Sequence, residues 1–283
     1  MSRHPRFEQI SPEVGELDEA AVDEAMQDDP DETLSMIADL TAATDPKLRA
    51  AARDLAARLM LDLAANAARR RRGIGRIVTA PFRGEGDIDI DASTEAFEGS
   101  GPRRRVRVEE LKARTWSKRD TAVCLVVDRS GSMGGKPLAT SALAAAAVAL
   151  REPDDYSVLA FGRDVVVAKS QDVRRPGPDV VNAVLTLRGF GTTDLTTALR
   201  AAADQLGRSR AARKVVVLLS DCRATEPGDV EAVARGLDEL CIVAPEGDDA
   251  EARLLAANVG AKIATVGEPS EVPAALVEVL ERR

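Results

Sequence analysis

Residues 121–132 read Thr-Ala-Val-Cys-Leu-Val-Val-Asp-Arg-Ser-Gly-Ser, an apolar run followed by polar residues. The first seven residues are largely apolar, which is typical of a parallel strand buried on both faces. Asp128 ends the run, and Ser130 and Ser132 follow at alternate positions. Alternate side chains of an extended loop point the same way, so these three oxygen-bearing residues can converge on one point.

Strands and helices alternate through the rest of the chain. Apolar runs predict further strands over residues 156–161, 164–168, 214–219, 240–244 and 261–266. Amphipathic stretches predict helices over residues 138–150, 180–187, 195–206, 229–237, 249–258 and 270–281. This alternation predicts an α/β fold, a doubly wound, mostly parallel six-stranded sheet with helices on both faces. The pair of strands joined at Gly162-Arg163 predicts one antiparallel edge strand.

Three loops of this fold carry oxygen donors. Ligands of doubly wound sheets bind beyond the carboxyl ends of the strands, so we expect the loops 128–135, 189–194 and 220–226 to meet there. The second loop offers Thr192 and Thr193, and the third offers Ser220 and Asp221. Carboxylates and hydroxyls form a hard, oxygen-only site of the kind that Mg²⁺ prefers.

The first 119 residues have a different character. Residues 16–70 are expected to be helical, because Asp29-Pro30 and Asp45-Pro46 each place a capping carboxylate before a proline at the first helical position. Residues 74–119 are expected to hold short strands and a basic linker, with an edge strand over residues 87–91. The chain therefore divides into a charged helical region (1–73), a segment of short strands and linker (74–119) and an α/β domain (120–283).

Charge is distributed unevenly along the chain. Residues 1–45 hold 13 acids and 2 bases, residues 46–119 hold 18 bases and 10 acids, and residues 120–283 hold 19 bases and 24 acids. We interpret this asymmetry as intramolecular, with an acidic head neutralising a basic middle. The alternative is that one of these segments docks a partner.

Composition excludes several classes of protein. The three cysteines form no C-x-x-C pair, which argues against a zinc finger. The single histidine, His4, stands in a polar terminal segment and is a poor candidate for a Ser–His–Asp triad. Aromatic residues are only 2% of the chain, which argues against a stacking surface for nucleic acid. No apolar segment approaches the length of a signal peptide core at the start or of a membrane span elsewhere, so we expect a cytoplasmic protein without membrane contact.

The α/β region resembles the von Willebrand factor A (VWA) domain with its metal-ion-dependent adhesion site. The resemblance rests on Asp128-x-Ser130-x-Ser132 after the first strand, a threonine in a glycine-containing loop and an aspartate ending a later strand. It implies that one divalent cation, Mg²⁺ or another such as Mn²⁺, is surrounded by Asp128, Ser130, Ser132, Thr193 and Asp221. Thr192 is the alternative loop ligand. The family often has glycine after the last aspartate, where this chain has Cys222.

This resemblance implies a non-catalytic module that captures an acidic side chain of a protein partner at the metal. The charged N-terminal region and the basic lead-in of Arg103–Arg107 also resemble the cytoplasmic VWA proteins that accompany MoxR-type AAA+ ATPases. That likeness implies an adaptor or co-chaperone to such an ATPase. One alternative is a Mg²⁺-dependent hydrolase that uses the same oxygens, and another is RNA binding through Arg69–Arg72 and Arg103–Arg107. An EF-hand over residues 87–98 is disfavoured, because Ala92 stands where its loop needs glycine.

Overall fold

The computed structural model describes residue 10 and residues 17–70, 77–81, 87–94, 111–116, 121–129, 134–189 and 191–281. Two compact units are formed, one by residues 1–70 together with 121–283 and one by residues 71–120. Among the described residues, no helix is both long enough and apolar enough to cross a membrane.

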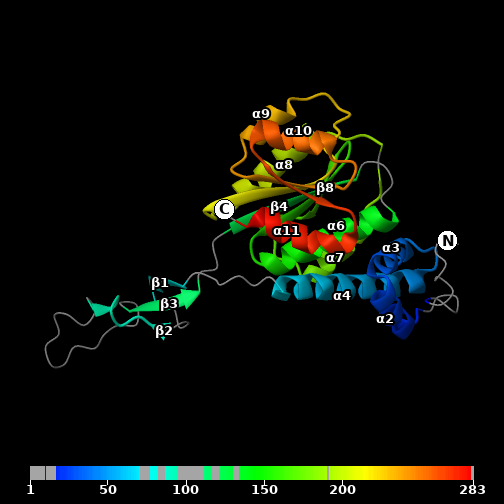
Figure 1. Cartoon of the computed structure of the whole chain (residues 1–283), viewed down its shortest axis with the longest axis horizontal. Coiled ribbons are helices and arrows are strands. Elements are labelled where there is room, and N and C mark those ends of the chain that lie inside the picture. Colours follow the sequence, from blue (N-terminus) through cyan, green and yellow to red (C-terminus); the bar gives the residue numbers. More distant parts are fainter. Residues whose placement is uncertain are drawn as a thin grey trace. The chain divides into compact units, whose positions relative to one another are not determined.

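A six-stranded sheet lies at the centre of the larger unit (Figure 1). Its strands are β4 (Thr121–Asp128), β5 (Tyr156–Phe161), β6 (Val165–Lys169), β7 (Arg213–Leu219), β8 (Leu240–Pro245) and β9 (Lys262–Val266). They lie in the order β6-β5-β4-β7-β8-β9, and all neighbours are parallel except the edge pair β5–β6. The doubly wound, mostly parallel sheet with an antiparallel edge strand is therefore confirmed.

Helices cover both faces of this sheet (Figure 1). They are α6 (Gly135–Arg151), α7 (Gly177–Leu185), α8 (Leu195–Gly207), α9 (Val230–Arg235), α10 (Ala250–Val259), the short 3₁₀ helix η2 (Pro269–Glu271) and α11 (Val272–Leu280). Alternate residues of β4 enter separate apolar clusters: Val123, Leu125 and Val127 pack with α6, α7 and α11, while Cys124 and Val126 pack with α8 and α10. The period of two along a strand produces these two cores from one apolar run.

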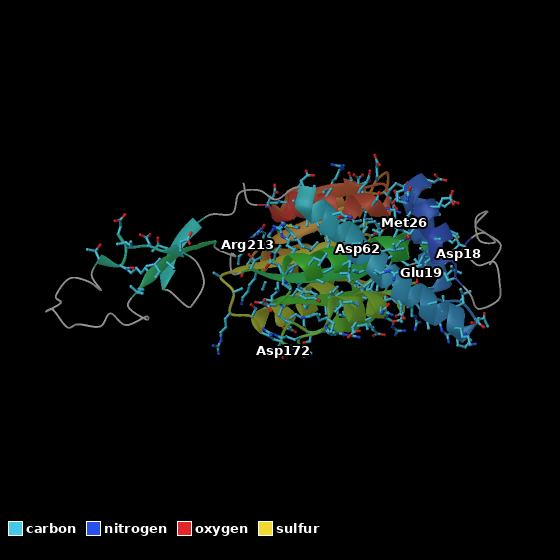
Figure 2. All side chains as sticks on the ribbon, turned by 90° about the horizontal axis from the view of Figure 1, so that it is seen from below. Asp18, Glu19, Met26, Asp62, Asp172 and Arg213 are labelled. Atoms are coloured by element: carbon cyan, nitrogen blue, oxygen red, sulfur yellow. The ribbon has the colours of Figure 1, made fainter. Side chains whose placement is uncertain are left out.

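The N-terminal helices form a further layer on the same unit. They are α2 (Glu19–Asp28), α3 (Pro30–Leu40) and α4 (Pro46–Arg70), and both predicted caps are present. Asp29 Oδ1 accepts a hydrogen bond from the Glu32 N–H at 3.0 Å, and Asp45 Oδ1 accepts one from the Leu48 N–H at 2.8 Å. Viewed from below, α4 lies across the outer face of this layer, with the exposed Asp62 labelled on it (Figure 2).

These helices share one core with the sheet. Leu34, Ile37 and Met60 are fully buried and belong to the same apolar cluster as α6 and the facing side of the sheet. Because α6 lies between the sheet and the helices α3 and α4, it is buried almost all round and is built largely of alanine. The larger unit is therefore a sheet with one helical layer on one face and two on the other.

The smaller unit contains a three-stranded antiparallel sheet. Its strands are β1 (Ile77–Pro81), β2 (Asp87–Ile88) and β3 (Lys112–Trp116), in the order β1-β3-β2. The strand expected over residues 87–91 is wrong in length and ends at Ile88. Asp89 Oδ1 accepts a hydrogen bond from the Ala92 N–H at 3.1 Å, so the chain turns there instead of extending.

Candidate metal centre

The order of the strands places Asp128 where a ligand site is expected. Strand β4 is central and pairs with β5 on one side and with β7 on the other. The chain runs from β4 to β5 and β6 on the first side and then crosses back to β7 on the second. The carboxyl end of β4 is therefore the topological switch point of the sheet. Asp128 is the last residue of β4, and the pairing of Val127 with Leu219 brings the end of β7 level with it.

Ser220 joins the first and third loops. Its hydroxyl donates a hydrogen bond to Asp128 Oδ2 at 2.6 Å and accepts one from the Cys222 N–H at 2.9 Å. With only 5% of its surface exposed, Ser220 fixes the orientation of the Asp128 carboxylate. The sequence offers Ser220 as an oxygen donor, but the predicted ligand set does not include it. Its position directly before Asp221, at the end of β7, is the signal that it orients the Asp128 carboxylate.

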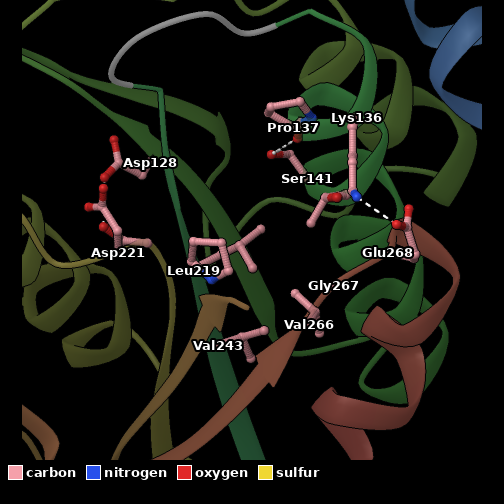
Figure 3. A pocket seen from close by; sticks show the side chains of 13 residues that line it. Asp128, Lys136, Pro137, Ser141, Leu219, Asp221, Val243, Val266, Gly267 and Glu268 are labelled. Atoms are coloured by element: carbon pink, nitrogen blue, oxygen red, sulfur yellow. Dashed lines mark hydrogen bonds and ion pairs between the residues drawn. The ribbon is translucent and has the colours of Figure 1, made fainter. Parts of the chain in front are cut away.

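Asp221 lies beside Asp128, and both line the same cavity (Figure 3). Its Oδ1 accepts a hydrogen bond from the Arg223 N–H at 2.9 Å. Burial is the largest cause that raises the pKa of Asp221, and the carboxylates of Asp128 and Asp248 raise it further. A cation bound here would favour the charged form of Asp221 and so oppose the rise in its pKa.

The threonine loop is tied to the loop that carries Asp221. The Thr193 N–H donates to Thr225 Oγ1 at 2.7 Å, and the Thr193 carbonyl accepts from the Thr225 N–H at 3.0 Å. Thr193 is 2% exposed, whereas Thr192 is half-buried. Asp194 caps α8 by accepting from the N–H and hydroxyl of Thr197 at 2.9 and 2.6 Å. The loops 189–194 and 220–226 therefore meet, as expected.

The predicted ligand set is thus brought together only in part. Asp128 and Asp221 lie side by side, and the Thr193 loop is hydrogen-bonded to the Asp221 loop. Ser130 and Ser132 lie outside the described residues. No group of three or more His, Cys, Asp or Glu side chains is placed to hold a metal within the described part of the chain. The expected centre would instead combine two carboxylates with hydroxyls, and its five ligands stay a prediction.

Two acidic residues of α3 accept hydrogen bonds from the chain segments near the candidate site. The α6 N-cap Gly134 provides no side-chain cap, and Asp39 Oδ1 instead accepts a hydrogen bond from the Gly135 N–H at 2.5 Å. Gly135 has a φ of +52°, a left-handed conformation that favours glycine. Asp31 accepts from the Ser270 N–H and hydroxyl at 2.7 and 2.8 Å, just after β9. The acidic head of the chain therefore caps backbone near the site.

Cys222 has a left-handed backbone conformation of the kind that favours glycine. Its φ is +63°, and it is the one described non-glycine residue with a positive φ. The side chain is buried in the apolar cluster under α8. Burial, together with the charges of Asp221 and Asp128, raises the pKa of the Cys222 thiol to about 12. The thiol stays protonated at neutral pH, so the donors at this edge are oxygens.

This conformation predicts a difference between two substitutions. Cys222→Gly relieves left-handed strain of ~1–2 kcal/mol while losing a small buried side chain, so we expect little net change in stability. Cys222→Val adds branching at Cβ to the same conformation, and we expect a loss of ~2 kcal/mol or more. Urea unfolding of both variants measures this. Equal losses for the two variants would show that the left-handed backbone is not retained.

Comparison with known proteins agrees with this fold. Residues 123–224 match the von Willebrand factor type A domain, and this segment carries Asp128, Thr193 and Asp221. The chain therefore carries a VWA domain. An uncharacterized protein of Synechocystis sp. is 34% identical over 110 residues, which are 38% of this chain and 26% of that protein. The chain thus spans about a quarter of the length of this relative.

Solved structures with a similar fold are more distant in sequence. Manganese-loaded TRAP protein of Plasmodium vivax is 17% identical, with 56% of this chain and 72% of that chain covered and a TM-score of 0.44. Proximal thread matrix protein 1 of the mussel byssus, with a zinc-occupied metal-ion-dependent adhesion motif, is 13% identical, with 57% and 47% covered and a TM-score of 0.46.

Proposed function

We propose that this protein is a non-catalytic binding module that holds a divalent cation, Mg²⁺ in the cell, and uses it to capture an acidic side chain of a protein partner. The observation that carries the proposal is the pair Asp128 and Asp221, which line one cavity at the switch point of the sheet, with Ser220 hydrogen-bonded to Asp128. Ser130, Ser132 and Thr193 would supply the remaining oxygens. A cation held by few anionic ligands keeps positive charge, so a partner's carboxylate completes its shell.

A finer proposal concerns the partner. The resemblance of the whole chain to the VWA proteins that accompany MoxR-type AAA+ ATPases supports an adaptor or co-chaperone role toward such an ATPase in the cytoplasm. All three cysteines, Cys124, Cys222 and Cys241, are free and buried, which suits a reducing compartment.

A hydrolase built on the same oxygens finds less support. Catalysis would need a carboxylate near the metal to act as a general base. Of the two carboxylates that the loops offer for this role, Asp194 is occupied in capping α8, which leaves Glu226. Turnover of a phosphoester that requires Mg²⁺ and is lost in Asp128→Ala would favour the enzyme.

Affinity purification with the full chain tests the binding function. We expect the immobilised protein to retain an AAA+ ATPase in Mg²⁺ and to release it in EDTA, and we expect Asp128→Ala to retain none. Asp204→Ala on the exposed face of α8 removes the same charge away from the site and serves as the matched control. Retention of the same proteins in EDTA or by Asp128→Ala contradicts metal-dependent capture.

A further inference from the structure

A cavity opens directly beside the proposed metal centre (Figure 3). Its volume of about 320 Å³ suits a side chain or a short segment better than a large cofactor. Apolar side chains from α6 and from three strands of the sheet or their ends line it: Pro137, Leu219, Val243, Pro245 and Val266. A side chain that enters this cavity is stabilised mainly by burying its apolar surface against these residues.

The polar groups around the cavity are largely paired with one another. Lys136 Nζ and Glu268 Oε1 form an ion pair at 2.7 Å that joins α6 to the segment after β9 (Figure 3). Ser141 Oγ donates to the Pro137 carbonyl at 2.8 Å. Apart from Asp128 and Asp221, the charged side chains that line the cavity are Lys136 and Glu268, whose opposite charges offset each other. The cavity therefore suits an uncharged, apolar side chain.

We propose that this cavity is a second subsite for the partner, which receives an apolar side chain two residues away from the acidic residue at the metal. The proposal rests on the metal-dependent capture proposed above and names the chemistry that accompanies it. Side chains two residues apart in an extended segment point to the same face. They lie about 7 Å apart along the strand, which suits a cavity that borders Asp128 and Asp221 themselves. The recognised element is thus an acidic residue, any residue and an apolar residue of leucine size.

Display of random heptapeptides on the full-length protein tests this element. In Mg²⁺ we expect enrichment of an acidic residue with Leu, Ile or Met two positions away, and we expect no such enrichment in EDTA. A synthetic peptide with leucine at that position should bind about ten- to a hundredfold more tightly than the same peptide with alanine.

Two variants separate the subsite from the metal centre. Thr140 lines the cavity from α6 and is partly exposed, so Thr140→Phe fills the space without entering the core. We expect this variant to keep the acidic preference and to lose the apolar one. Ala257→Phe, on the exposed face of α10, adds the same ring on the opposite side of the sheet and should change neither preference.

The outcomes distinguish the two proposals. Enrichment of an acidic residue with no apolar preference two positions away, or with a basic residue at that second position, overturns the subsite and leaves metal-dependent capture standing. Loss of both preferences in Thr140→Phe also overturns the subsite as a separate element. If no acidic residue is enriched in Mg²⁺, metal-dependent capture fails, and the subsite fails with it.

Discussion

Saturating Mg²⁺ raises the free energy of unfolding of the wild-type protein, and Asp128→Ala abolishes that increase. An ion that binds only the folded state stabilises it by about 2.7 kcal/mol at a concentration one hundred times its dissociation constant. Asp128 is the carboxylate that Ser220 holds at the end of β4, so its removal takes away the centre of the donor set. Thermal unfolding with and without Mg²⁺ measures the difference, which amounts to several degrees.

A charge-neutral variant separates ion binding from folding. Asp221→Asn keeps an oxygen that can accept the Arg223 N–H, but it removes a carboxylate that burial and Asp128 disfavour. In EDTA we therefore expect this variant to be at least as stable as the wild type, while Mg²⁺ stabilises it less. A variant that is much less stable in EDTA and fully stabilised by Mg²⁺ would contradict a metal role for Asp221.

Ile37→Ala in α3 destabilises the whole larger unit, by ~2–5 kcal/mol. Ile37 is fully buried in the core cluster that also contains α6 and the facing strands. Because the N-terminal helices and the sheet share this cluster, we expect the larger unit to unfold in one cooperative transition, and we expect the substitution to lower the midpoint of that whole transition. Denaturant unfolding followed by far-ultraviolet circular dichroism and by the protection of amides in β4 and β7 measures it.

The matched control for this substitution is Leu254→Ala. Leu254 lies on α10 with 55% of its surface exposed, so its truncation should change stability by no more than ~0.5 kcal/mol. If Ile37→Ala instead lowers only the denaturant midpoint of a separate, early transition and leaves the amide protection of β4 unchanged, the N-terminal helices form a separate folding unit.

Much of the α/β architecture could be predicted because its signals are local. An apolar run such as Val215–Leu219 has few other interpretations, and Asp-Pro pairs mark helix starts through one carboxylate and one missing N–H. The meeting of the loops followed from topology alone, since the carboxyl ends of parallel strands share one edge.

The packing of the N-terminal helices depended on contacts that no local pattern reports. Asp31 and Asp39 cap backbone groups more than 90 residues away, at Ser270 and Gly135. The Glu19–Arg58 ion pair fits the interpretation of the charge asymmetry as intramolecular. Asp31 and Asp39, in contrast, accept hydrogen bonds from uncharged backbone N–H groups. One signal was available: α6 is apolar on nearly all sides, which indicates a helix covered on both faces.

The candidate site was predictable in its residue types more than in its geometry. The position of Asp128 at a strand end followed from the sequence, whereas the bridging hydrogen bond of Ser220 depends on the register of β4 against β7. The left-handed backbone at Cys222 could not be predicted from the residue itself, because cysteine rarely adopts it. The glycine that VWA domains often have at this position was the available signal.

Anomalous diffraction from crystals of the full-length protein grown with Mn²⁺ would locate the proposed cation. We expect one strong anomalous peak per chain, bounded by the carboxylates of Asp128 and Asp221 at the carboxyl end of β4, and no such peak in crystals of Asp128→Ala. Ordered crystals that show no peak at this edge, or a peak held only by the acidic stretch Asp87–Asp91, would contradict this expectation.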